Sequence, residues 1–173
     1  MPNVAEAMEQ LSARISADPT KARARNMPAT ARLTEGLQCE LTGPYNERLV
    51  TDMAPAIGGG ASGPNPGWLL RGALASCTAT VIAMRAAKLG VALSSLEVKV
   101  ETDSDLRGIL GLDESVSAGH GPVRFEVRIG APDASPEVLR EIVEWADRHS
   151  PVVCTLRQVP ECSLEVEIVD PAS

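Results

Sequence analysis

Aromatic side chains are scarce in this sequence: Trp, Tyr and Phe together make up 2% of its 173 residues. We therefore expect an interior built from Ala, Val, Leu and Ile, with Trp68 and Trp145 as rare large side chains that fill the remaining space. Histidine is equally rare, and none of the four cysteines stands in a C-x-x-C pair. A tetrahedral zinc site needs such ligand spacings, so neither a metal nor another cofactor is predicted.

An excess of positive charge is also missing. The formal net charge is -7, and the basic residues cluster only in the short run 21–25. Because an acidic surface repels phosphate backbones, nucleic acid is not an expected partner.

Long hydrophobic runs are absent as well. The longest uncharged apolar stretch, residues 72–84, is too short to cross a bilayer. Residues 1–17 contain Glu6, Glu9 and Arg14 and no apolar block, which is unlike a signal peptide. We therefore expect a cytoplasmic protein that does not bind membranes and whose cysteines are free thiols.

The length and the hydrophobic fraction of 44% are typical of one globular domain. Residues 4–17 place Val, Met, Leu and Ile at helical spacing, and a polar linker follows them. We accordingly divide the chain into an N-terminal helix and linker, residues 1–29, and a single domain, residues 30–173.

The first half of this domain is predicted to contain strands and one long helix. Residues 30–42 alternate between apolar and polar positions, which predicts a half-buried strand, and residues 48–51 are expected to pair with it. Asn65 then caps a helix that has Pro66 at its first position and stops at Gly90. That helix is apolar on nearly every face, which favours a place in the centre of the fold.

The second half continues the same pattern. Residues 96–101 and 123–129 alternate cleanly and predict two strands, each with one face in water. A helix is expected to begin at Ser135, which is followed by a proline. The pair Ser150–Pro151 repeats this pattern and is expected to start a short third segment. Alternation over residues 164–168 predicts a last strand. The sum is an α+β fold in which helices cover one face of antiparallel sheet.

Residues 58–63 match the G-x-G-x-x-G pattern of dinucleotide-binding loops, but the context is wrong. Pro55 does not suit a central strand before the motif, and Pro64 and Pro66 follow it in place of an immediate helix. No acidic residue lies about 20 residues further on, where a ribose contact is expected. A flexible loop ahead of the central helix is the better interpretation.

Two cysteines are candidates for thiol chemistry. Cys77 lies about three turns into the central helix, where a small core residue and a reactive thiol are both open interpretations. Cys154 lies in the first turn or so of the segment that begins at Ser150, where the helix dipole favours a thiolate. Cys39 and Cys162 fall in predicted strands and are interpreted as packing residues.

The two histidines are interpreted structurally. His120 lies in the loop 117–122 and is expected at the surface. His149 lies in the last turn of a predicted helix, where the dipole favours a cation. No Ser-His-Asp or Cys-His pair can be assigned from spacing, because such groups are recognised by geometry rather than by order.

Two stretches of the sequence resemble the OsmC/Ohr family of small thiol proteins, within a match over roughly residues 30–169. The first is G-P-N-P-G-W-L-L at 63–70, which runs into A-L-A-S-C at 73–77. The second is S-P-V-V-C-T-L at 150–156. The family pattern is an N-P turn, a helix carrying A-x-C, and a later segment similar to C-P-V-x-x-T-L.

The resemblance implies an α+β homodimer in which antiparallel sheets wrap around two central helices, with sites at the subunit interface. It also implies thiol-dependent reduction of hydroperoxides. One cysteine attacks the peroxide and becomes a sulfenic acid, and a second cysteine resolves it as a disulfide. An external dithiol then completes turnover.

The sequence departs from the family pattern at two positions. Cys77 matches the family's helix cysteine, but Ser150 stands where the second cysteine is expected. The Glu that commonly follows the N-P turn and orients an activating Arg is absent, since Gly67 is found there; Arg32 is one candidate for that arginine. Ser150 and Cys154 are four residues apart, so they share one face if this segment is helical. We therefore take a Cys77–Cys154 pair as the hypothesis for a relocated dyad.

Three functions stay open at this stage. The first is an OsmC-like stress-response protein that reduces organic hydroperoxides, with Cys77 and Cys154 as catalytic residues. The second is a non-catalytic protein that binds a small apolar ligand in an interface pocket lined by Trp68 and Ser150. The third is a structural dimer whose thiols are inert.

Overall fold

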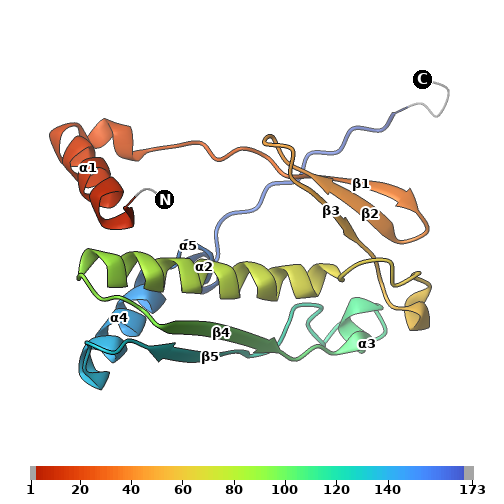
Figure 1. Ribbon diagram of the computed structural model, residues 1–173. Coiled ribbons are helices and arrows are strands. Elements are labelled where there is room, and N and C mark those ends of the chain that lie inside the picture. Colours follow the sequence, from red (N-terminus) through yellow and green to blue (C-terminus); the bar gives the residue numbers. More distant parts are fainter. Residues whose placement is uncertain (1–2, 170–173) are drawn as a thin grey trace.

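The structure is a computed structural model that describes residues 3–169 of the chain. Its longest element is the helix α2 (Pro66–Lys88), and the shorter helix α1 (Val4–Ala17) lies above the C-terminal end of α2 in Figure 1. The strands form two antiparallel sheets: β1 (Thr30–Glu35), β2 (Gln38–Thr42) and β3 (Arg48–Thr51) in one, and β4 (Ser95–Thr102) and β5 (Val123–Gly130) in the other. In Figure 1 the two sheets lie on opposite sides of α2. The predicted combination of helices and antiparallel sheet is confirmed.

Capping residues define the two ends of α2, as predicted. The Asn65 side chain accepts a hydrogen bond from the backbone N–H of Trp68 at 2.8 Å, and Pro66 occupies the first helical position. After the helix, Gly90 adopts a φ of +70°, a conformation that a glycine reaches without strain. The helix is long and apolar enough to cross a membrane by length and composition alone. Its buried side chains, however, pack against the protein's own core.

The core lies where α2 meets β4 and the helix α4 (Pro136–His149). It is aliphatic, as the shortage of aromatic residues predicts, and its fully or almost fully buried members are Leu74, Val81, Ile82, Ala86, Ile142, Ala146 and Val153. Trp145 packs against this cluster. The expectation that Trp68 also fills the core is wrong, because 53% of its surface is exposed. Trp68 lies in the first turn of α2, beyond the reach of α4.

The strands β4 and β5 confirm the two alternating segments predicted for the second half. They pair in register over their whole length, with Leu96 opposite Ile129 and Val98 opposite Val127. The apolar positions are half-buried beneath α2, and the charged positions between them are exposed. Each strand therefore has one face toward the core and one face in water.

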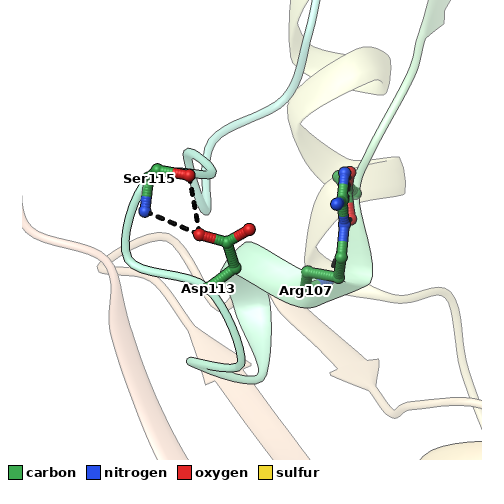
Figure 2. A network of polar contacts seen from close by, with 4 residues as sticks. Arg107, Asp113 and Ser115 are labelled. Atoms are coloured by element: carbon green, nitrogen blue, oxygen red, sulfur yellow. Dashed lines mark hydrogen bonds and ion pairs between the residues drawn. The ribbon is translucent and has the colours of Figure 1, made fainter.

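The connection from β4 to β5 contains a short helix, α3 (Leu106–Ile109), which the sequence patterns do not reveal. Figure 2 shows the polar network around it. Asp113 accepts hydrogen bonds from the Ser115 backbone N–H at 3.0 Å and from its hydroxyl at 2.6 Å, and Arg107 pairs with Asp105 at 2.6 Å. These contacts span two residues, so they order the part of the loop around α3 locally. The ends of the loop are joined by the hydrogen bond from the Gly121 N–H to the Asp103 carbonyl at 2.8 Å.

The single strand expected over residues 30–42 is wrong. The segment forms a hairpin, β1 and β2, with a two-residue turn at Gly36 and Leu37, and Gly36 has a φ of +55°. Residues 48–51 do pair, as expected, through β3 against β2. Alternation continues across so short a turn, which is why a period of two cannot distinguish one strand from two.

The last strand, expected over residues 164–168, is also wrong in this chain. The segment is extended but has no paired neighbour among the described residues. Its apolar side chains are almost fully exposed: Leu164 by 87%, Val166 by 74% and Ile168 by 93%. An alternating sequence becomes a strand only beside another strand that can satisfy its backbone groups.

Candidate functional site

Cys77 and Ser150 meet where α2 contacts the start of the helix α5 (Pro151–Arg157). The Ser150 hydroxyl donates a hydrogen bond to the Cys77 sulfur, with Oγ and Sγ 3.2 Å apart. Ser150 is completely buried, and Cys77 is half-buried. The two residues are 73 positions apart in the sequence, so the fold itself creates this contact.

The Ser150 hydroxyl forms an unusual hydrogen bond for a residue at the start of a helix. Ser150 precedes Pro151 at the start of α5, where a serine normally accepts a hydrogen bond from a backbone N–H of the first turn. Ser135 does this for α4, accepting from the Val138 N–H at 3.4 Å. Ser150 makes no such bond and donates to Cys77 instead. A buried hydroxyl is thereby aimed at a sulfur atom and held there.

Cys154, the second predicted catalytic thiol, has a different environment. Its thiol donates to the backbone carbonyl of Arg148, with Sγ and O 3.4 Å apart. The hydrogen bond to Asp147 is the main cause that raises the pKa of Arg157, and attraction to Cys154 adds to it. The hydrogen-bond partner of Cys77 is Ser150 rather than Cys154.

Trp68 lies outside the Cys77–Ser150 contact, on the first turn of α2. It lines a cavity of about 390 Å³ together with Arg71, Asn65 and the residues that follow β3. The sequence prediction placed Trp68 and Ser150 in one interface pocket. In this chain they stand in different places, Trp68 at the N-terminal end of α2 and Ser150 beside its middle.

Gly67, the position where the family commonly has Glu, lies directly against the ring of His120. A Cβ atom on Gly67 would come within 2.9 Å of two ring atoms, so a side chain here would have to displace the imidazole. His120 is half-buried and its Nδ1 is 2.8 Å from the Ser104 hydroxyl oxygen. His120 thus lies in the loop, as predicted, with part of its ring exposed.

His149 takes the structural place predicted for it, at the end of α4. Its ring stacks on Trp145 with centroids 3.9 Å apart, and its Nδ1 donates to the Trp145 carbonyl at 2.7 Å. The guanidinium of Arg85 lies 5.0 Å from the centre of the Trp145 ring and pairs with Glu141 at 3.0 Å. This stack ties α2 to α4 immediately before Ser150.

The remaining candidates lie elsewhere. Cys39 is half-buried on β2, and Arg32 is exposed on β1. Cys162 is exposed in the extended C-terminal segment, so its expected place in a strand is wrong. All four cysteines are free thiols, as predicted. Within the described residues, no group of three His, Cys, Asp or Glu side chains is placed to hold a metal ion.

Asp52 is a residue that the sequence analysis missed. It follows β3, is only 4% exposed, and its carboxylate accepts from the backbone N–H groups of Met53, Gly60 and Ser62 and from the Ser62 hydroxyl. The glycine-rich loop expected to be flexible is therefore folded around one carboxylate. An aspartate just before a glycine-rich run is the signal that could have identified it.

Acid is expected to destabilise this loop through Asp52. The N–H groups of Ser62 and then Met53 hold the pKa of the Asp52 carboxyl below its ordinary value. A lowered pKa contributes stability that is present above the unfolded-state pKa, about 3.9, and is lost as the pH falls through the lower folded-state pKa. Melting temperatures measured from pH 7 to pH 2 should therefore fall less steeply for Asp52→Asn than for the wild-type chain.

The exposed Asp133, in the turn before α4, provides the control for this experiment. Asp133→Asn should leave the wild-type slope unchanged. Equal slopes for wild type and Asp52→Asn would show that the loop does not depend on the ionised carboxylate.

Comparison with known proteins agrees with this architecture. The family model for OsmC-like protein matches residues 58–165, which is more than half of the chain. Among solved structures, an OsmC-like protein from Mycoplasma pneumoniae has a TM-score of 0.66 at 18% identity, covering 79% of this chain and 91% of that one. A search of curated proteins finds no significant match.

Two further solved structures are named as organic hydroperoxide resistance proteins. The one from Legionella pneumophila has a TM-score of 0.58 at 15% identity and covers 78% of this chain and 91% of its own. The one from Bacillus subtilis has a TM-score of 0.53 at 19% identity and covers 78% and 93%. At these identities the likeness concerns the fold. With the family model spanning most of the domain, the chain belongs to the OsmC-like protein family.

Proposed function

We propose that this chain is a cytoplasmic stress-response protein that reduces organic hydroperoxides at Cys77. The contact between Cys77 and the buried hydroxyl of Ser150 carries the proposal. Proteins of the same fold from Legionella pneumophila and Bacillus subtilis are named for resistance to organic hydroperoxides, which supports the choice of substrate. Free cysteines and an acidic surface fit a reducing, intracellular compartment.

In the proposed reaction the Cys77 thiolate attacks the outer oxygen of the hydroperoxide. A sulfur–oxygen bond forms, the oxygen–oxygen bond breaks, and the departing alkoxide takes up a proton to become an alcohol. Cys77 is thereby oxidised to a sulfenic acid. The Ser150 hydroxyl is close enough to the sulfur to stabilise negative charge as it develops on the leaving oxygen.

The sulfenic acid must then be reduced by a thiol. A thiolate attacks the Cys77 sulfur and forms a disulfide, and the displaced hydroxide takes up a proton and leaves as water; a second thiol then reduces the disulfide. Ser150 cannot supply that thiol. We propose an external dithiol as the reductant, with Cys154 as the candidate for an internal resolving thiol one helical turn beyond Ser150.

We further propose that the working form is a homodimer. One face of α2 presents small side chains at helical spacing, and Ala73, Ser76, Thr80 and Ala83 are all exposed on it. The apolar residues of the first sheet and of the C-terminal segment are exposed too, among them Leu33, Leu49, Leu164 and Ile168. A second copy that covers these surfaces would bury a helix face, a sheet face and the extended C-terminal segment together.

Binding without catalysis is the second candidate function. Two departures from the family pattern favour it. Ser150 stands at the position of the second family cysteine, and Gly67, with His120 against it, replaces the Glu expected after the N-P turn. In this case the chain would hold a small apolar ligand near α2 at the subunit interface and leave Cys77 reduced.

Trapping the sulfenic acid separates the two functions. After one equivalent of cumene hydroperoxide, dimedone should label Cys77 in most molecules, while Cys39 and Cys162 stay unlabelled, as read by peptide mass spectrometry. Cys77→Ser should abolish both the label and the consumption of hydroperoxide. A Cys77–Cys154 disulfide in place of the label would identify Cys154 as the resolving thiol.

The opposite result is equally clear. If Cys77 keeps its free thiol at peroxide doses that already oxidise the exposed Cys162, hydroperoxide reduction is not the function of this site. Non-catalytic binding would then stand in its place.

A further inference from the structure

The cavity at the N-terminal end of α2 contains an arginine without a carboxylate partner. Two arginines among the described residues are not exposed at the surface, Arg71 and Arg85. Arg85 pairs with Glu141 at 3.0 Å. Arg71 forms no ion pair with any described residue and donates a single hydrogen bond, from Nη1 to the Thr102 hydroxyl oxygen at 3.2 Å.

This one contact holds the guanidinium without neutralising it. Thr102 ends β4 and offers an uncharged acceptor, so the other N–H groups of Arg71 remain available. A charged group that is half removed from water favours a partner that restores its hydrogen bonds and its charge balance. Since no described side chain provides that partner, a ligand can.

The acidic residue in the same cavity is already occupied. Asp52 lines the cavity with Arg71, but its two carboxylate oxygens accept four hydrogen bonds from Met53, Gly60 and Ser62. It lies outside ion-pair distance of Arg71. The negative charge of Asp52 therefore stabilises the loop. The positive charge of Arg71 remains available to a ligand in the cavity.

The rest of the cavity suits a planar apolar group. Trp68 and Arg71 are three residues apart and share a face of α2. The indole lies along the helix beside Gly72, where a Cβ atom would be 3.7 Å from the ring. Backbone atoms and small residues, including Ala54, Ala61, Gly63 and Pro64, complete the wall around about 390 Å³. That volume is within the range of small-molecule sites.

We propose that this cavity binds a small carboxylate with an aromatic or similarly flat apolar group. Arg71 receives the carboxylate, because a guanidinium can donate two parallel hydrogen bonds to its two oxygens. Trp68 contacts the apolar group at the mouth. The site is separate from Cys77 and needs no peroxide chemistry, so it stands independently of the proposed peroxidase function.

A matched pair of probes tests the charge requirement. Calorimetric titration of the full chain, as the Cys77→Ser variant, with 4-phenylbutyrate should show saturable binding with one site per chain. The neutral 4-phenylbutanamide has the same shape and should bind at least about tenfold more weakly. Equal affinities for the two probes, or no saturable binding of either, would overturn the proposal.

Substitution of the arginine tests its role. Arg71→Gln should lower the affinity for the carboxylate to that for the amide, and Arg71→Lys should retain an intermediate preference because an ammonium makes no bidentate contact. Arg140→Gln is the control, since Arg140 is exposed on α4 and lines a different cavity. A carboxylate preference that survives in Arg71→Gln, in protein with a wild-type melting curve, would show that another group binds the anion.

Discussion

Replacing Ser150 with cysteine is expected to convert the Cys77 site into a disulfide-forming dyad. The Ser150 oxygen already lies 3.2 Å from the Cys77 sulfur, and a disulfide needs about 2.05 Å between sulfur atoms. Side-chain rotation and a small shift can supply the difference. One equivalent of organic hydroperoxide should therefore give nearly complete disulfide between Cys77 and the new thiol, and dithiol-dependent turnover should rise at least about tenfold over wild type. Non-reducing peptide mapping and peroxide consumption measure the two effects.

Ser135→Cys is the matched control for this substitution. Ser135 also precedes a proline and a helix, but its hydroxyl caps α4 and does not contact a sulfur. It should form no disulfide with Cys77. If Ser150→Cys keeps two free thiols under the same treatment, the contact seen between Ser150 and Cys77 does not represent a reactive geometry.

A charge in the exposed small-residue face of α2 is expected to separate the dimer. In Ala73→Glu a carboxylate would stand where the proposed partner subunit packs closely. An unpaired charge buried in such a contact costs about 3–5 kcal/mol, which corresponds to a dissociation constant raised by about two to almost four orders of magnitude. Sedimentation velocity at micromolar concentration should show a dimer for wild type and a monomer for the variant.

The exposed Ala13 on α1 provides the same substitution away from this face. Ala13→Glu should sediment as wild type. A wild-type chain that is monomeric at micromolar concentration, or an Ala73→Glu variant that remains dimeric, would contradict the assigned interface.

Local chemistry made much of this fold predictable. The helices α2 and α4 start where the sequence places them, because the caps Asn65 and Ser135 and the prolines that follow act within one turn. At the start of α5 only Pro151 acts in this way, since the Ser150 hydroxyl donates to Cys77. The strands of the second sheet follow from alternation alone. These features depend on neighbours a few residues away, so a single sequence is enough to identify them.

The predictions that are wrong concern features that depend on residues far away in the sequence. The C-terminal segment alternates like a strand, but whether it pairs depends on an edge supplied from elsewhere. The sequence pattern predicts one strand in place of the hairpin at Gly36, because a tight turn preserves the period of two. Trp68 looked like a core residue by type, yet its position on the first turn of α2 decides its exposure.

The candidate site was predictable only in part. Cys77 and Ser150 could be identified as matching the family's two cysteine positions, but the hydrogen bond between them links residues 73 positions apart. Arg71 gave no signal at all in the sequence, because an arginine on a helix is ordinarily solvated or paired. Its lack of a partner is a property of the folded surroundings rather than of its neighbours in the chain.

The carboxylate of Asp52 has a consequence for how the cavity near Trp68 meets a ligand. Loops rich in glycine usually lose much conformational entropy when they close around a molecule. Here the loop from Met53 to Ser62 is already tied to one buried anion before anything binds. The loop is thus preorganised. A molecule that enters the cavity does not lose affinity to the cost of ordering this loop.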